Sequence, residues 1–323
     1  MFGNILITGG TGSFGKALLN YLIKTKYKKK IIIFSRDELK QHEIKKKYMN
    51  YSNLRFFLGD IRDYERLEYA IKEVDTVVHA AALKQVDTAE YNPFEFVKTN
   101  ILGSENIIKA ALQSNVKKVV ALSTDKASSP INLYGATKLC ADKLFSSANI
   151  YKGKKDIKFS IVRYGNVFGS RGSVFQIFQK QSKNSKYFQL THKNMTRFNI
   201  SLQDSVKLVV WSLKNMIGGE IFVPKLKSYN LVDLAKAINP NKPIKFIGIR
   251  PGEKIHEEMI SFDEFKNTYD LGNYYSYINP IVTKSNKFYK KKFKIVKNNF
   301  SLNSYNCDRL SISELKKIII SNS

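Results

Sequence analysis

The fold is decided by the stretch Thr8-Gly9-Gly10-Thr11-Gly12-Ser13-Phe14-Gly15, where a glycine-rich turn joins a strand pattern to a helix pattern. The apolar residues 5–8 come before the turn, and a helix pattern over residues 15–26 follows it. Glycine permits a tight turn and lets backbone N–H groups approach a pyrophosphate at the start of a helix. The turn is therefore predicted to bind a dinucleotide through Gly9, Gly12, Ser13, Phe14 and Gly15.

Strand and helix patterns alternate through the first half of the chain. The expected strands are residues 5–8, 31–35, 54–58, 76–80, 119–123 and 159–163. Helix patterns lie between them at residues 15–26, 37–48, 63–72 and 93–114. Such alternation indicates βαβ units, and right-handed crossovers then build a doubly wound parallel sheet of the α/β class, a Rossmann fold. Ligands of such sheets lie beyond the carboxyl ends of the strands.

The alternation breaks after about residue 170, which predicts a second and smaller part. We expect residues 1–170 to form the cofactor-binding domain that also carries the catalytic residues. Residues 171–323 are expected to form mainly a substrate-binding lobe, with some segments returning to the main sheet. The elements expected there are helices 201–215, 231–238 and 311–320 and strands 220–224 and 244–247. The polar and aromatic region 262–306 has no readable pattern.

Length and composition favour a cytoplasmic enzyme. The 323 residues are 43% hydrophobic, which is enough for a large core. We find no apolar run near 18 residues and no signal-peptide layout before the first strand, so no membrane association is expected. Cys140 and Cys307 offer neither a disulfide framework nor metal-ligand spacing, so no metal is expected.

The formal net charge of +27 raises the question of nucleic acid. The basic residues are dispersed rather than gathered in one tail, so we interpret them as a solvated basic surface and expect no nucleic-acid partner. A positive field would help to collect an anionic nucleotide substrate. A dehydrogenase-fold scaffold recruited to RNA is the alternative, and it would bind with steep salt dependence.

Cofactor choice is expected at the end of the second strand, where Ser35-Arg36-Asp37 stand. A lone acid there pairs with the ribose 2′-OH of NAD, whereas an arginine accommodates the 2′-phosphate of NADP. Because Ser35 and Arg36 come first, with Lys40 one helical turn on, the sequence favours NADP. Asp37 keeps NAD open, unless it is simply the acid of a helix N-terminus. Further residues expected to line the cofactor are Asp60, Ile61, Ala80, Ala81 and Lys84.

A tyrosine and a lysine four residues apart, Tyr134 and Lys138, form the predicted redox pair on one side of a helix. A nearby ammonium lowers the pKa of the phenol, so Tyr134 is expected to take the proton of a substrate hydroxyl as hydride leaves its carbon. Lys138 would also hold the nicotinamide ribose, and Thr124 would hydrogen-bond the same oxygen as Tyr134. Asp125 and Lys126, which end the fifth strand, indicate chemistry beyond hydride transfer.

The chain resembles the extended short-chain dehydrogenases/reductases, a family of nucleotide-sugar enzymes, over essentially its whole length. The Asp125-Lys126 pair resembles that of the configuration-inverting UDP-N-acetylglucosamine 4,6-dehydratases of the pseudaminic-acid pathway, which modifies bacterial flagellin. Gln85 departs from the family, which more often has histidine there. The matching segments are 35–40, 79–84, 130–135, 163–167, 195–198 and 250–254.

This resemblance implies a reaction and a set of roles. Oxidation at C4, loss of water across C5–C6 and hydride return to C6 would give UDP-2-acetamido-2,6-dideoxy-β-L-arabino-hex-4-ulose, the first step of pseudaminic acid synthesis, with the NADP recycled. Lys126 would be the neutral C5 base and Asp125 the protonated C6 acid. A homo-oligomer, specifically a hexamer, is also implied. The residues implied to bind UDP-N-acetylglucosamine are Lys84, Asn166, Arg197, Arg250 and Glu253.

A simple UDP-sugar 4-epimerase is the alternative enzyme. Hexose 4-epimerases of the family usually lack an acid–base pair after the fifth strand, and epimerisation needs no C5 base. The sequence therefore favours a dehydratase over an epimerase through Asp125-Lys126.

Overall fold

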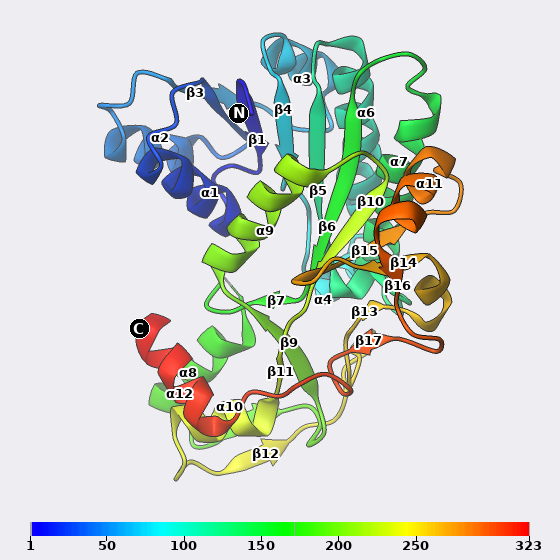
Figure 1. The fold of residues 1–323 in the computed structure, drawn as a ribbon. Coiled ribbons are helices and arrows are strands. Elements are labelled where there is room, and N and C mark those ends of the chain that lie inside the picture. The colour runs from blue at the N-terminus through cyan, green and yellow to red at the C-terminus, as the bar shows by residue number, and fades with distance from the viewer. Residues whose placement is uncertain (1, 171, 323) are drawn as a thin grey trace.

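The main body of the protein is a ten-stranded sheet, seen in a computed structural model that describes residues 2–170 and 172–322. Its strand order is β16-β14-β15-β10-β6-β5-β4-β1-β2-β3, and the strands from β10 to β3 are all parallel (Figure 1). The parallel strands are β1 (Ile5–Thr8), β2 (Ile31–Ser35), β3 (Leu54–Leu58), β4 (Thr76–His79), β5 (Lys118–Thr124), β6 (Lys158–Tyr164) and β10 (Glu220–Pro224). The doubly wound parallel sheet predicted from the sequence is confirmed.

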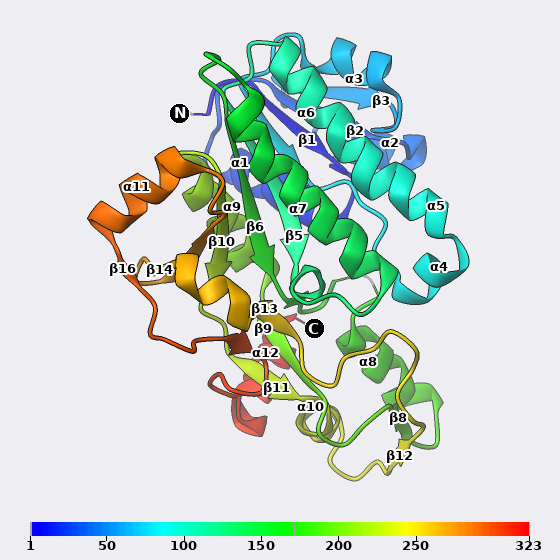
Figure 2. The same cartoon turned by 90° about the vertical axis from the view of Figure 1, so that its right-hand side faces the viewer.

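Helices cover both faces of this sheet, which explains why its central strands are almost wholly apolar. Every residue of β1, β2 and β4 is buried, as expected of parallel strands with covered faces. One face packs on α3 (Tyr64–Ile71), α6 (Gly103–Gln113) and α7 (Leu133–Tyr151). The other packs on α1 (Ser13–Lys24), α2 (Glu38–Lys47) and α9 (Leu202–Asn215), and the two views of the fold show both layers (Figure 2).

The C-terminal half extends the sheet at one edge. β15 (Tyr274–Ile278) pairs antiparallel with β10, β14 (Thr268–Asp270) pairs with β15, and β16 (Lys294–Ile295) ends the row. These strands, with η3 (Phe262–Asn267) and α11 (Thr283–Lys292), account for most of the region that had no readable pattern. Their shortness is the reason, because two- to five-residue strands give little periodicity.

A smaller lobe lies below the carboxyl ends of the parallel strands (Figure 1). Its own apolar core includes Phe175, Phe188, Tyr229 and Leu234. The lobe's helices are α8 (Val174–Asn184), α10 (Leu231–Ile238) and α12 (Ile312–Asn322). Its strands are β7 (Asn166–Val167), β8 (Phe188–Leu190), β9 (Thr196–Ile200), β11 (Ser228–Asn230) and β12 (Ile244–Phe246). The pair β13 (Glu258–Ile260) and β17 (Leu302–Asn303) instead packs Met259, Ile260 and Leu302 into the core of the main body.

The helix expected over residues 93–114 is interrupted by one wide turn. It consists of α5 (Pro93–Phe96), the π-helical segment η1 (Val97–Leu102) and α6. Asn100 lies in η1 and its amide pairs with both the N–H and the carbonyl of Leu83, each at 2.9 Å, and also donates to the Thr137 hydroxyl. A wide turn at a functional site is common, and here it ties the loop after β4 to α7. A short helix, α4 (Val86–Tyr91), follows the same loop.

None of the helices in residues 2–170 and 172–322 is long and apolar enough to cross a membrane.

Gly15 provides a test of the turn that begins the fold. A Cβ on Gly15 would lie 2.5 Å from the Cα and carbonyl oxygen of Gly10, and backbone cannot move aside as a side chain can. We expect Gly15→Ala to lower the free energy of unfolding by about 1–3 kcal/mol through overpacking, measured by urea denaturation. Lys16→Ala, which removes only an ion pair 3.8 Å long, is the control and should change stability little. Equal stability of the two variants would contradict the close packing of this turn.

Candidate active site

One cavity of about 1080 Å³ opens at the carboxyl ends of the parallel strands, between the sheet and the smaller lobe. All the residues predicted to bind cofactor or substrate or to act in catalysis line this cavity. The sequence placed them from position 9 to position 253, so the fold gathers distant segments into one space. Its lining also includes residues that the sequence did not suggest, among them Asp87, Gln181 and Glu257.

The glycine turn forms a close-fitting cradle at one end of the cavity. Gly9 has φ +63°, and a Cβ there would lie 2.8 Å from the backbone nitrogen of Ala81 and 2.9 Å from the carbonyl of Ala80. α1 starts at Ser13, and its N-cap residue Gly12 has no side chain to satisfy the first N–H groups. These free N–H groups and the helix dipole suit a pyrophosphate. The residues at this end of the cavity therefore fit a dinucleotide.

Charged side chains lie in the cavity where β2 and β3 end. Arg36 Nη1 is 3.4 Å from Asp60 Oδ2, and Arg62 Nη2 contacts the same oxygen at 2.7 Å. Asp37 is the N-cap of α2, where its carboxylate accepts a hydrogen bond from the Lys40 N–H at 2.9 Å and also pairs with the Lys40 ammonium. Asp37 thus has the helix N-terminal role that the sequence allowed, while the half-exposed Arg36 side chain faces the cavity.

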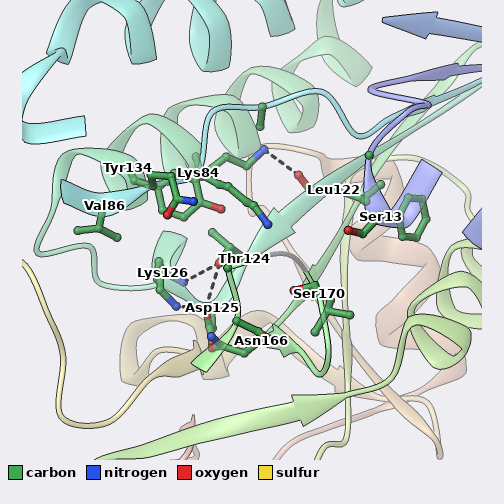
Figure 3. A pocket seen from close by; sticks show the side chains of 18 of the residues that line it. Ser13, Lys84, Val86, Leu122, Thr124, Asp125, Lys126, Tyr134, Asn166 and Ser170 are labelled. Carbon is green, nitrogen blue, oxygen red and sulfur yellow. Dashed lines mark hydrogen bonds and ion pairs between the residues drawn. The ribbon is translucent and has the colours of Figure 1, made fainter. Parts of the chain in front are cut away.

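Tyr134 lies on α7 beside the end of β5. Asn132 caps this helix by accepting from the Gly135 N–H at 2.8 Å, which places Tyr134 in the first turn. The Thr124 hydroxyl hydrogen-bonds the phenol. Burial raises the pKa of Tyr134 to about 12, and the opposing cation of greatest effect is Lys126. Tyr134, Thr124 and Lys126 point into the same space (Figure 3).

Lys138, four residues after Tyr134 on α7, is hydrogen-bonded to the backbone of β5. Its ammonium donates to the carbonyl of Leu122 at 2.7 Å, and it is buried. Burial lowers the pKa of Lys138, while the carboxylate of Asp142 one turn further along α7 opposes the shift. The redox pair of Tyr134 and Lys138 stays a prediction. In the structure, the cation that acts most to lower the pKa of Tyr134 is Lys126.

Lys126 is clamped between two carboxylates. Its Nζ lies 3.0 Å from Asp125 Oδ1 and 2.9 Å from Glu257 Oε1, and both acids are almost fully buried. Burial acts to lower the pKa of Lys126, but the two anions outweigh it and raise that pKa. Burial raises the pKa of Asp125, as its predicted role of acid requires. The neutral Lys126 expected of a base is therefore not the resting form, because two anions surround the amine.

Two arginines, Arg197 and Arg250, share the carboxylate of Glu253, and Arg197 also contacts Glu257. Arg197 Nη2 lies 3.6 Å from Glu253 Oε1, and Arg197 Nε lies 3.6 Å from Glu257 Oε1. Arg250 Nη2 donates to Glu253 at 3.2 Å and has a largely exposed side chain. Buried Oδ1 of Asn166 has no hydrogen-bond partner among the described residues. These groups can receive an anionic and hydroxyl-rich ligand, because arginine forms bidentate contacts with phosphate.

A buried ion network joins α7 to β6 of the sheet. The guanidinium of Arg163 in β6 lies 2.9 Å from Glu264 Oε2 and 3.4 Å from Asp142 Oδ2, and it also donates to the Met259 carbonyl at 2.9 Å. Ser123 donates to the same Asp142 oxygen at 2.8 Å. Burial raises the pKa of Asp142, and the charge of Arg163 opposes that shift. The network fixes the helix that carries Tyr134.

Sequence reasoning missed Glu257, Asp142 and Asn100 as parts of this site. Glu257 follows the predicted 250–254 loop by three residues, which is the one signal that pointed toward it. Asp142 stands four residues after Lys138, on the same helix side. Nothing in the sequence indicated Asn100, because its amide binds the backbone of Leu83, which lies 17 residues earlier.

The fold and the cavity define a protein of the Rossmann type with the extended short-chain dehydrogenase/reductase architecture. The family model described as polysaccharide biosynthesis protein matches residues 5–279. The chain belongs to this family.

Two curated relatives and one solved structure refine the comparison. The chain is 52% identical to the UDP-N-acetylglucosamine 4,6-dehydratase (inverting) of Campylobacter jejuni, over 93% of this chain and 87% of that one. It is 41% identical to a UDP-glucose 4-epimerase of Rickettsia bellii, over 98% and 95%. The X-ray structure of Pen from Bacillus thuringiensis matches with a TM-score of 0.91 at 38% identity, over 99% and 98%. The resemblance expected from the sequence is confirmed.

Arg163 gives a test of the buried network. We expect Arg163→Met to lower the free energy of unfolding by about 3–5 kcal/mol, because it leaves the Asp142 carboxylate buried without its cation. The loss should be small at acid pH and grow as the pH rises above about 4, since a buried carboxylate binds its proton more tightly in the folded state. Urea denaturation over that pH range measures it.

The double variant Arg163→Met/Asp142→Asn is the matched comparison. It removes the carboxylate as well as the cation, so its stability should depend less on pH than that of Arg163→Met. A single variant with a flat pH dependence would contradict the proposed unpaired carboxylate.

Proposed function

We propose that this protein is a UDP-N-acetylglucosamine 4,6-dehydratase that inverts the configuration at C5. The observation that carries the proposal is the Asp125–Lys126 pair, which stands beside Tyr134 in the cavity. A hydroxyl oxidation needs only the tyrosine, whereas an elimination also needs a base and an acid. The 52% identity to the inverting dehydratase of Campylobacter jejuni supports the same reaction.

NADP is the proposed cofactor. The cradle of Gly9, Gly12 and Ser13 would hold the pyrophosphate, and Ser35 and Arg36 would receive the 2′-phosphate. Bound nicotinamide supplies a hydride acceptor for C4 and, later in the same cycle, a hydride donor for C6. Arg36 supports NADP over NAD because its half-exposed guanidinium lines the cavity, while Asp37 is engaged in capping α2.

The first proton transfer falls to Tyr134, whose phenolate takes the proton of the C4 hydroxyl. A Tyr134 with a pKa near 12 needs a cation, and Lys126 is the charge that lowers this pKa most. Thr124, whose hydroxyl hydrogen-bonds the phenol and donates to Asp125 Oδ1 at 3.0 Å, would orient Tyr134. Lys138 would hold the ribose beside it.

The elimination falls to Asp125 and Lys126. The C4 ketone acidifies the C5 proton and places the C6 hydroxyl β to the carbonyl. Neutral Lys126 then takes the C5 proton, and protonated Asp125 gives its proton to the departing C6 hydroxyl, so the step releases water. Both groups must first lose their charges. Burial raises the pKa of Asp125 and so favours its protonated form, and transfer of one proton from Lys126 to Asp125 would leave the amine neutral.

The lobe would bind the nucleotide. Arg197 and Arg250 are proposed to take the diphosphate, Glu253 a uridine-ribose hydroxyl, and Asn166 and Lys84 to lie near the sugar and nicotinamide. We accordingly propose residues 1–170 as the cofactor-binding domain and residues 171–323 as mainly the substrate-binding lobe. We propose that the enzyme is a cytoplasmic homo-hexamer. Its product would enter pseudaminic acid synthesis, which supplies flagellin modification.

Lys126→Ala separates the proposed dehydratase from an epimerase. In heavy water the wild-type enzyme should place deuterium at C5 of a product that lacks the C6 hydroxyl, as NMR of the product reports. Lys126→Ala should lose elimination by roughly 10²–10⁴-fold, the contribution of a general base. It should still bind UDP-N-acetylglucosamine, because Arg197 and Arg250 remain.

Lys143→Ala, an exposed lysine of α7, is the control and should dehydrate at the wild-type rate. The 41% identity to a protein named UDP-glucose 4-epimerase makes epimerisation the second candidate. A product with an intact C6 hydroxyl and inverted configuration at C4 would show epimerase activity and contradict the proposed dehydratase activity.

Arg36→Ala tests the choice of cofactor. Loss of a charge-assisted contact costs about 1.5–3 kcal/mol, so NADP should bind roughly 10- to 100-fold more weakly, while NAD should bind nearly as before. Titration of both cofactors measures this. Arg62→Ala, which removes the other cation on Asp60, should not discriminate between them. Equal weakening of NAD and NADP by Arg36→Ala would be incompatible with the NADP assignment.

A further inference from the structure

Glu257 is a buried acid of the cavity that has no role in the reaction described above. Only 2% of its surface is exposed. Oε1 is shared between Lys126 Nζ at 2.9 Å and Arg197 Nε at 3.6 Å. Oε2 has no hydrogen-bond partner in the part of the chain that the structure describes. Burying an ionised carboxylate without a partner costs free energy. The negative charge of Glu257 is therefore stabilised mainly by the two neighbouring cations, Lys126 and Arg197.

The charges around Glu257 come from three segments. Asp125 and Lys126 reach it from the end of β5, Arg197 from β9, and Lys254 from the loop before β13. Burial acts to raise the pKa of Glu257, but Lys126 and then Arg197 outweigh it and lower that pKa, so the acid is ionised. The anion in turn acts to raise the pKa values of both Asp125 and Lys126. The three groups therefore titrate together.

We propose that Glu257 is the positioning residue of the elimination, holding the Lys126 amine between Asp125 and the substrate and stabilising the ammonium that forms there. The inference rests on the proposed dehydratase function. Glu257 touches no reacting atom itself, and it acts through Lys126.

The proton balance explains why such a residue is needed. From the resting ion pair, one proton moves 3.0 Å from Lys126 Nζ to Asp125 Oδ1, so an N–H bond breaks and an O–H bond forms. This transfer produces the neutral amine and the protonated acid that elimination needs, with no proton taken from solvent. Lys126 then gains the C5 proton and Asp125 loses its own to the leaving hydroxyl. The ammonium is thereby restored, and Glu257 lies where that charge develops.

Glu257 also links Lys126 to substrate binding. The arginine proposed to take the diphosphate contacts the same Glu257 oxygen as Lys126 does. The anion thus keeps the two cations of the cavity at fixed places 2.9 and 3.6 Å from one oxygen. Without it, the like charges of Lys126 and Arg197 would repel each other.

Glu258 provides a matched control, because it is the next acid in the chain and has different partners. Its Oε2 accepts hydrogen bonds from Ser129 at 2.6 Å and Ser128 at 3.3 Å. E258Q therefore removes one negative charge from the same segment and leaves the contacts of Lys126 in place.

The test is the pH profile of single-turnover dehydration of UDP-N-acetylglucosamine by the wild type, E257Q, E257D and E258Q. Loss of the Glu257 anion makes protonation of Asp125 and Lys126 less favourable, so both limbs of the E257Q profile should move to lower pH by about 1–3 units. E258Q should keep the wild-type pH optimum. E257D keeps the charge and withdraws the carboxylate by about 1 Å, so it should keep the optimum while turning over roughly 10²-fold more slowly.

Thermal stabilisation by UDP shows that each variant is folded. A folded E257Q that keeps the wild-type pH optimum, whether or not it is slower, overturns the proposal, because a purely structural role would not move the optimum. If E257Q does not fold, E257D decides: wild-type turnover in E257D overturns the positioning role, and slow turnover at the wild-type optimum supports it. A wild-type enzyme that leaves the C6 hydroxyl intact would overturn the proposed function instead.

Discussion

The parallel arrangement of the central strands is the constraint on which the site depends. Strands that run in one direction must all end at the same edge of a sheet, so the loops that follow them share one space. The glycine turn after β1, the charged residues after β2 and β3 and the acid–amine pair after β5 meet for this reason. Each is placed by the strand before it.

Buried charge is the second organising feature, and it occurs in two layers. The upper layer, Asp125, Lys126 and Glu257, lies in the cavity and carries one unit of negative charge that Arg197 balances. The lower layer joins Asp142, Arg163 and Glu264 beneath α7. The three groups of the upper layer line the cavity, whereas those of the lower layer do not. This difference separates a layer able to exchange protons from one that only holds the helix.

Local pattern predicted the parallel sheet closely, because fully buried strands leave apolar runs whose ends can be read to within a residue. It also predicted the residues of the cavity, since glycine spacing and residues at strand ends are local signals. It could not predict the wide turn at Asn100 or the clamp by Glu257. Each depends on a partner distant in sequence, Thr137 for the former and Lys126 for the latter. The short strands β14 and β16 left no period to read.

The order in which the chain is made has a consequence for the cavity. Lys126 and Tyr134 are made in the first half of synthesis, together with the strands β1 to β5. Glu257, Glu264 and the edge strands β14 to β16 belong to the last quarter of the chain. A nascent protein would therefore carry Lys126 without Glu257, and α7 without Glu264, until that later segment has been made. Catalytic competence is acquired late, as a property of the completed polypeptide rather than of its nucleotide-binding half.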